Sequence, residues 1–258
     1  MSRTNNKFIR CYVSGYDLSG EARSVGSYGY QFDNEPMFAY ADGSKNIVNG
    51  IATTQVDPLN AFLSPATSPA IGIHELLNTG AGLHTYTIAF GMRALPAQGD
   101  FIFTMPMEQA GYQAEGVGVN VNWGGVTSTN ALVPNGFNCP FGRLLHANGA
   151  ETAVNSAVGI DDYGATPPSL GGIFTYHLFS SDGTVTLTAQ EADTNVDGSF
   201  ANITGATSGS VDASAAPKHG IIATATGAAI KRYLRWQLAF GTASTATFII
   251  GFNRRLWK

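Results

Sequence analysis

The stretch Asp193-Thr-Asn-Val-Asp-Gly198 carries the most regular set of potential metal ligands in the sequence. Its spacing matches the first half of a calcium loop, in which carboxylate and amide oxygens at alternate positions bind the ion. The twelfth position holds Thr204, where bidentate binding needs a glutamate, and the flanking segments are typical of strands. Because Asn, Asp and Gly also build tight turns, the pattern favours a hairpin turn over a calcium site.

Two adjacent carboxylates, Asp161 and Asp162, raise the question of acid–base hydrolysis of a glycoside. A glycosidase needs two carboxylates that face the same bond, whereas adjacent residues of an extended chain usually point apart. The surrounding segment is rich in Gly and Pro, which indicates a loop. We therefore interpret the pair as loop residues, and a glycosidase would need a second carboxylate from a distant part of the chain.

The other reactive groups are scattered singly along the chain. Gly116 and Gly118 lack the third glycine of a phosphate-binding loop, and His74-Glu75 begins an H-E-x-x-H pattern that fails at Asn78. No cysteine pair has metal-binding or disulfide spacing, so we expect free thiols in a reducing compartment. The isolated groups are His74, His84, His146, His177, His219, Cys11 and Cys139. The sequence assigns no catalytic, cofactor-binding or metal-binding residue and predicts that the protein is not an enzyme.

Three aromatic residues near glycine-rich turns suggest one further kind of site. Trp123, Tyr163 and Trp257 could stack on sugars in a carbohydrate-binding β-sandwich. Packing in a core or an interface explains them better and is the interpretation that we prefer.

Charged residues make up only 12% of the 258 residues, and the net charge is −4. An ordinary soluble protein has about 25% charged residues, so this surface is either rich in hydroxyl groups or covered by other subunits. We favour assembly. The net charge argues against sequence-specific nucleic-acid binding. The clustered cations could face either carboxylates or phosphates, and they are Lys231, Arg232, Arg235, Arg254, Arg255 and Lys258.

No segment has the apolar length of a signal peptide core or of a membrane span. We therefore expect the chain to be made and folded in a cytoplasm.

Glycine and proline separate short runs that are rich in β-branched and aromatic residues, which predicts a mainly β fold, an antiparallel sandwich or a barrel-like variant of one. Asp57-Pro58 and Gly80 indicate two short helices, over 57–63 and 71–79. Turn residues over 130–168 predict a long loop and a soft boundary between regions 1–168 and 169–258, which could also form one domain. The predicted strands are 6–14, 46–56, 84–93, 101–107, 114–123, 172–180, 183–190, 219–226, 230–240 and 244–253.

The last two predicted strands show the clearest alternation of apolar and polar residues. Leu234, Trp236, Leu238 and Phe240 fall on one face of the first, and Ala246, Phe248, Ile250 and Phe252 on one face of the second. The short connection between them predicts one long antiparallel hairpin with a buried face.

Several phrases occur in a fixed order along the chain. YVSGYDLSGEARSVG is followed by NGIATTQVDPLNAFL, GMRALPAQGD, VTLTAQEADTNVDGSFANITGATSGSVD and KRYLRWQLAFGTASTATFIIGF. Together they resemble virion structural proteins of tailed bacteriophages, most closely the tail tube (major tail) proteins of long-tailed phages. The likeness spans most of the chain but contains no catalytic motif, and capsid-decorating proteins have similar phrases.

This resemblance implies a β-sandwich subunit that forms rings, commonly of six copies, stacked into a tube around the tape-measure protein and later around passing DNA. It implies a place in the virion, synthesis in the bacterial cytoplasm, no membrane contact, and an N-terminal arm and long loop for which residues 1–14 and 35–56 are candidates. A lumen that shares the negative charge would let DNA slide without sticking. The alternatives are a capsid decoration protein, or a carbohydrate-binding or depolymerising module of a phage fibre.

Overall fold

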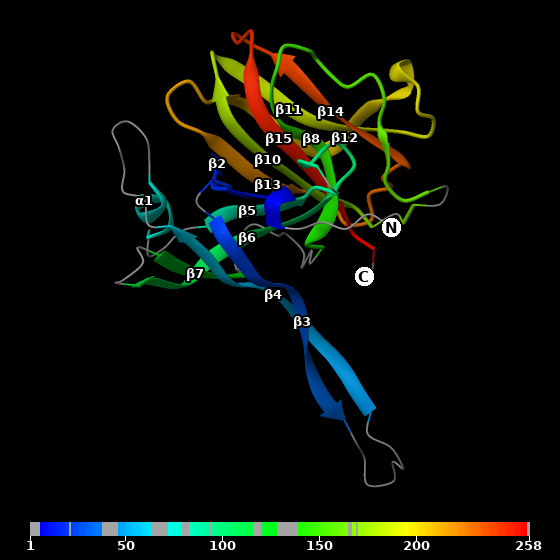
Figure 1. Ribbon diagram of the computed structural model, residues 1–258. Coiled ribbons are helices and arrows are strands. Elements are labelled where there is room, and N and C mark those ends of the chain that lie inside the picture. Colours follow the sequence, from blue (N-terminus) through cyan, green and yellow to red (C-terminus); the bar gives the residue numbers. More distant parts are fainter. Residues whose placement is uncertain are drawn as a thin grey trace.

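The computed structural model describes residues 6–20, 22–37, 46–62, 72–78, 83–92, 94–115, 120–127, 139–164, 167–168 and 170–256. Within these ranges the chain forms two antiparallel sheets, of 11 and 4 strands, and a single α-helix (Figure 1). The mainly β, sandwich-like fold predicted from the sequence is confirmed. Among the described residues, no helix is long and apolar enough to cross a membrane.

The larger sheet has the strand order β13-β10-β15-β8-β6-β5-β1-β2, with β7 pairing to β6, β4 to β7 and β3 to β4. Its strands are β1 (Ile9–Val13), β2 (Tyr16–Asp17), β3 (Ala22–Met37), β4 (Asn46–Phe62), β5 (Leu83–Phe90), β6 (Phe101–Glu115), β7 (Asn120–Thr127), β8 (Phe141–Glu151), β10 (Gly172–Ser181), β13 (Lys218–Ala223) and β15 (Ala246–Arg254).

The smaller sheet has the order β12-β11-β14-β9. Its strands are β9 (Ile160–Asp161), β11 (Thr184–Ala192), β12 (Ala201–Asp212) and β14 (Tyr233–Phe240). The helix α1 (Ile73–Leu77) and the 3-10 turns η1 (Asn6–Phe8) and η3 (Asp197–Ser199) complete the described elements.

The two sheets pack face to face over the largest core. Trp236 and Leu238 of β14 and Leu187 of β11 meet Phe174 of β10 and Phe248 of β15, and all are nearly or fully buried. Burying several large side chains in this way is the main source of stability for a sandwich. A second core lies in the N-terminal half of the larger sheet, where the apolar residues of α1 join a cluster that contains Tyr86, Ile88, Phe103 and Trp123.

The central strands of the larger sheet are buried on both faces, which explains their nearly continuous apolar sequences. In β10, Phe174 and Leu178 face the smaller sheet, whereas Ile173 and His177 face the other side. The sheet curls, so that strands at its two ends approach each other. The Thr85 hydroxyl of β5 lies 2.9 Å from Nδ1 of His219 on β13, although the two strands are not hydrogen-bonded through their backbones.

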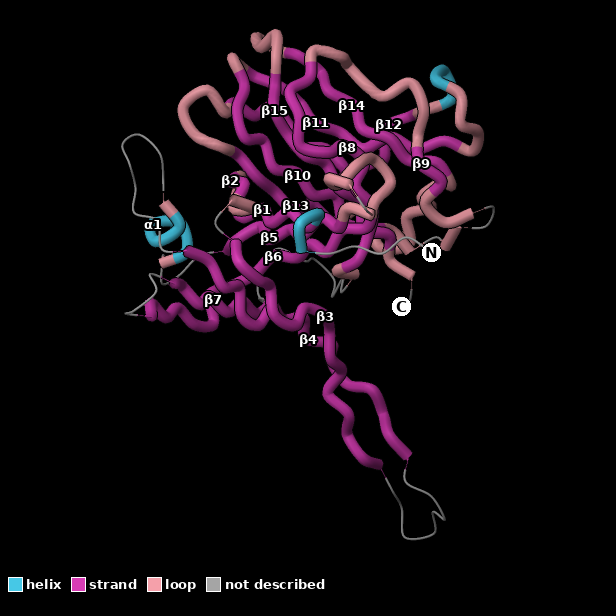
Figure 2. The backbone as a smooth tube through the Cα atoms, in the orientation of Figure 1, coloured by secondary structure: helices cyan, strands magenta, loops and turns pink. Residues whose placement is uncertain are grey.

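Strands β3 and β4 form a long antiparallel hairpin that leaves the rest of the molecule, and we call it the arm (Figure 1). Its base is held because residues 55–62 of β4 pair with β7. Beyond that point, residues 30–37 of β3 and 46–54 of β4 pair only with each other among the described strands. Figure 2 shows these two segments running side by side, clear of the other strands of the two sheets, which we call the body.

The predicted terminal hairpin is wrong. The alternation is correct, since Leu234, Trp236, Phe248 and Ile250 are all buried in one core. However, β14 pairs with β11 and β9, and β15 pairs with β10 and β8, so the two strands belong to different sheets. They face each other across the core because the connection 241–245 passes from one sheet to the other.

Three further sequence predictions need correction. Residues 57–62 are not a helix but continue β4, and the predicted loop 130–168 contains the strand β8. Strands β3 and β12 were not predicted at all. The second short helix is confirmed as α1, and one sheet joins strands on both sides of residue 168.

The two segments that the resemblance suggested for intersubunit contacts have different places in the structure. Residues 1–5 lie outside the described residues, and residues 9–13 form β1 between β2 and β5, inside the body. Residues 35–37 and 46–56 lie in the arm, whereas 38–45 are outside the described residues.

Candidate interaction surface

The basic residues near the C-terminus face carboxylates. Lys231 Nζ lies 2.8 Å from Asp193, Arg232 binds Asp161, Arg235 binds Asp197 and Arg254 binds Asp162. Of the two partners left open by the sequence, the structure therefore selects acidic side chains for these four residues. Lys258 lies outside the described residues.

The side chains of the segment 193–198 turn toward different parts of the protein. Asp193 pairs with Lys231, Asp197 pairs with Arg235, and Asn195 exchanges two hydrogen bonds with the backbone of Gly159. A calcium loop would need these oxygens to converge on one point. No group of three or more His, Cys, Asp or Glu side chains in the described part of the chain is arranged to hold a metal ion. The segment is an ordered connection between β11 and β12, as the turn interpretation predicted.

The adjacent residues Asp161 and Asp162 point to two different arginines. Asp161 is exposed, and its hydrogen bond from Arg232 lowers the pKa of its carboxyl group. Asp162 accepts a hydrogen bond from Nε of Arg254 at 2.7 Å, with only 7% and 2% of the two side chains exposed. Arg254 also donates to the backbone oxygens of Ile230 and Lys231. The two carboxylates therefore support the loop and β15 and do not form a catalytic pair.

The histidines hold structural positions within the fold. The fully buried His177 accepts a hydrogen bond at Nδ1 from the backbone N–H of Gly15, so its Nε2 carries the proton and donates to Thr87 at 2.9 Å. Burial holds the pKa of His177 well below its usual value, and the nearby His219 adds to this effect. His74 bonds to the Tyr112 hydroxyl at 2.6 Å.

His146 stacks on Phe248 and bonds to Glu151. His84 bonds to Ser14 and packs edge-on against Trp123.

Both cysteines are free and buried, and burial raises the pKa of each thiol to about 12, which makes them unreactive at neutral pH.

The aromatic residues proposed to stack on sugars have different environments in the structure. Trp123 is completely buried, so a sugar cannot reach it, and Trp257 lies outside the described residues. Tyr163 is 49% exposed and lines a hollow.

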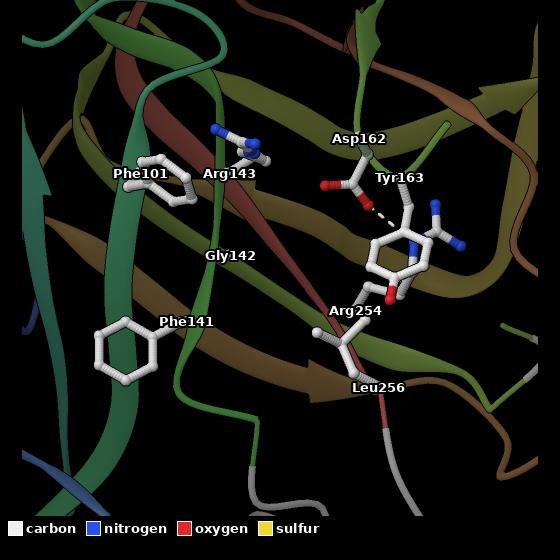
Figure 3. Close-up of a pocket in the computed structure, with 8 residues that line it drawn as sticks. All are labelled: Phe101, Phe141, Gly142, Arg143, Asp162, Tyr163, Arg254 and Leu256. Carbon is white, nitrogen blue, oxygen red and sulfur yellow. Dashed lines mark hydrogen bonds and ion pairs between the residues drawn. The ribbon is translucent and has the colours of Figure 1, made fainter. Parts of the chain in front are cut away.

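The hollow is an open depression of about 200 Å³ at the ends of β6, β8 and β15, shown in Figure 3. Four large apolar or aromatic side chains around it are 42–49% exposed. Its lining residues are Phe101, Phe141, Gly142, Arg143, Asp162, Tyr163, Arg254 and Leu256. Gathering exposed apolar groups around one depression is typical of a protein interaction site.

The register in which β6 pairs with β8 brings together residues that line this hollow. Phe101 of β6 lies directly opposite Arg143 of β8, and the Arg143 guanidinium stacks 3.9 Å from the centre of the Phe101 ring. Gly142 allows β8 to pack closely against β15 at the hollow, because a Cβ at this position would meet the backbone oxygen of Phe252 at 2.4 Å. Figure 3 shows Phe101, Phe141 and Arg143 on one side and Asp162, Tyr163, Arg254 and Leu256 on the other.

The charges of the hollow do not cancel. Asp162 and Arg254 neutralise each other, whereas Arg143 donates to the backbone oxygen of Gly99 and has no carboxylate partner among the described residues. The hollow therefore offers aromatic edges and one net positive charge. Tyr163, Asp162 and Arg254 each stand out in the sequence, whereas Phe101, Phe141 and Arg143 do not, because only the pairing of β6 with β8 brings these three together.

No protein-family model matches this chain, and no curated protein sequence matches it significantly. A solved structure similar to this chain is the SPP1 Dit protein, whose title describes a paradigm of the hub adsorption apparatus in phages that infect Gram-positive bacteria. The alignment covers 96% of this chain and 99% of that chain, with 10% identity and a TM-score of 0.33. At this TM-score the likeness carries no argument about fold or function, and the chain is assigned to no family.

Proposed function

We propose that the chain is a self-assembling structural protein of a tailed-phage virion, and that it forms the stacked rings of a tail tube. The sequence phrases that resemble tail tube proteins give the class. In this proposal the protein is not an enzyme, it contacts other copies of itself, the tape-measure protein and passing DNA, and it is made in the host cytoplasm.

The observation that carries the proposal is the arm. An isolated two-stranded hairpin is at best marginally stable in water, because the outer edge of each strand leaves backbone N–H and C=O groups without partners. Residues 30–37 and 46–54 are such a hairpin in the single chain. A neighbouring copy can satisfy these edges by adding a strand or by covering them.

The charge composition supports the same proposal. Four cations of the body are already paired with carboxylates, and the chain as a whole has only 12% charged residues. A surface with few charges costs little to desolvate when subunits meet.

A capsid decoration protein remains the second candidate of the same class. It would coat a shell as monomers or trimers and would not polymerise alone. A carbohydrate-binding or depolymerising module loses part of its support, because Trp123 is buried and the carboxylates of Asp161 and Asp162 are bound to separate arginines.

The test is negative-stain microscopy and sedimentation velocity of the purified chain over a wide concentration range. Rings or hollow polymers support the tube. Discrete particles that coat empty capsids would instead favour decoration, and a monomer at all concentrations that enters no particle would contradict both.

A variant with a shortened arm tests whether the arm is required for assembly. Tyr28 lies opposite Val56 in the arm, so residues 29–55 can be replaced by Asn-Gly, which closes a two-residue hairpin turn at that register. We expect this short-arm variant to keep the melting midpoint of the full chain and to remain monomeric. Unchanged polymerisation of the variant would contradict the role of the arm.

A further inference from the structure

The hollow is too small and too open for a typical ligand pocket. Pockets that bury a small molecule usually enclose about 300–1,000 Å³, whereas this depression has about 200 Å³ and lies open to solvent. Its exposed rings and its stacked arginine are instead the features of an interface centre, where aromatic and Arg residues dominate and one partner side chain fills a depression.

The arm has the complementary composition. The sequence of β3 places Tyr28, Tyr30 and Phe32 at alternate positions, and Asp33 and Glu35 follow toward its outer end. Aromatic residues suit the exposed rings of the hollow, and the acidic residues complement the positive charge of Arg143. The two regions are thus both aromatic and opposite in charge.

The arm cannot serve the hollow of its own chain. Figure 1 shows the outer part of the arm standing clear of the body, whereas the hollow lies in the body at the ends of β6, β8 and β15. We propose that the hollow of one copy receives the arm of a second copy, with an aromatic residue of β3 as the anchor in the hollow and an acidic residue of β3 facing Arg143. This inference rests on the proposed function and names the contact through which the copies assemble.

The first test maps the contact directly. A benzophenone amino acid replaces Tyr163 in isotope-labelled chains, which are mixed with unlabelled wild-type chains, assembled and irradiated. We expect mass spectrometry to find the label joined to unlabelled peptides from the arm, residues 22–62. Adducts in assembled material that involve only peptides of the body would overturn the inference and leave the proposed function intact.

The second test uses charge reversal. Arg143→Glu should raise the protein concentration needed for assembly by at least about tenfold, because it sets like charges against each other. Combining it with Glu35→Arg or Asp33→Arg should bring that concentration back to within about threefold of wild type. Lys218→Glu is the matched control, since Lys218 is exposed on β13 and outside the hollow, and it should assemble normally.

The variant Arg143→Gln distinguishes an effect of the Arg143 charge on assembly from an effect on folding. The melting midpoint of each variant shows whether loss of the Phe101 stack destabilises the body, and only assembly defects of variants that melt as wild type are counted. If Arg143→Glu assembles as wild type, or if neither arm reversal rescues it, the inference fails. If the wild-type chain itself never assembles, the proposed function fails.

Discussion

Strand β10 lies inside the body with a neighbour along each edge and a core on each face, whereas the outer part of β3 has one neighbour among the described strands. Both contain three aromatic residues, but β10 has no charged residue, whereas β3 has Arg23, Asp33 and Glu35. The two strands therefore differ both in charge and in the number of neighbouring strands. The body pairs its own strand edges and buries its own apolar groups, whereas under the proposed function a second chain satisfies the edges of the arm.

This comparison predicts large single-residue effects in the body. Trp236 is 5% exposed and packs edge-on against both His146 and Phe248, so Trp236→Ala leaves a cavity between the sheets. We expect it to lower the free energy of unfolding by about 3–5 kcal/mol in denaturant titrations. Tyr30→Ala in the outer arm is the counterpart, and it should leave the unfolding of the monomer unchanged. A loss below about 1 kcal/mol for Trp236→Ala would show that the sandwich core is not the source of stability.

The adjacent aspartates provide a matched pair within the body. Asp162→Ala removes the partner of an arginine that is only 2% exposed, and leaving that charge buried should cost about 3 kcal/mol of unfolding free energy. Asp161→Ala breaks an ion pair in which Asp161 is exposed and Arg232 is only partly buried, so no measurable change in the melting midpoint is expected. Equal effects of the two changes would contradict the burial of the Arg254 ion pair.

The arm should differ from the body in hydrogen exchange. In the monomer, the backbone amides of residues 30–37 and 46–54 should exchange rapidly, because only one weakly supported ladder protects them. Assembly should slow this exchange by about a hundredfold, which corresponds to about 2.7 kcal/mol. Amides of β10 and β15 serve as the internal control and should be protected in both states. Protection of the arm in the monomer would remove the argument that it needs a partner.

The sequence patterns predicted the buried face of a strand better than they predicted the strands with which it pairs. The alternation around Trp236 and Phe248 correctly identified the residues of the core, because side-chain periodicity follows from local backbone geometry alone. It could not identify the sheet, because a turn of five residues can join two strands of one hairpin or carry the chain across a sandwich. The tertiary pairings β14 with β11 and β15 with β10 decide this.

In the segment 57–62, tertiary strand pairing also overrides a local sequence signal for a helix. Asp57-Pro58 is typical of a helix start, but in the structure residues 55–62 lie between β3 and β7 and continue the sheet, with Leu59 fully buried. Pairing along two edges outweighs a weak helix propensity. The hollow was not predictable for a related reason, because Phe101 and Arg143 are 42 positions apart in sequence and meet only through the register of β6 and β8.

The smallest expected effect comes from the contact that joins the ends of the curled sheet. His177 is neutral in the folded protein, since its Nδ1 accepts from Gly15 and its Nε2 donates to Thr87, with His219 opposite it on β13 and the Tyr12 ring nearby. Its pKa is lowered on folding, so the unfolded chain binds the proton first, and stability is full above pH 6.5 and falls as the pH drops below that value. Between pH 7.5 and 5.5 this residue alone should cost about 1.4 kcal/mol of unfolding free energy. The variant His177→Gln should lose correspondingly less over the same range, measured by denaturant titration at each pH. If the two proteins show the same pH dependence, His177 is not the group that titrates in this range.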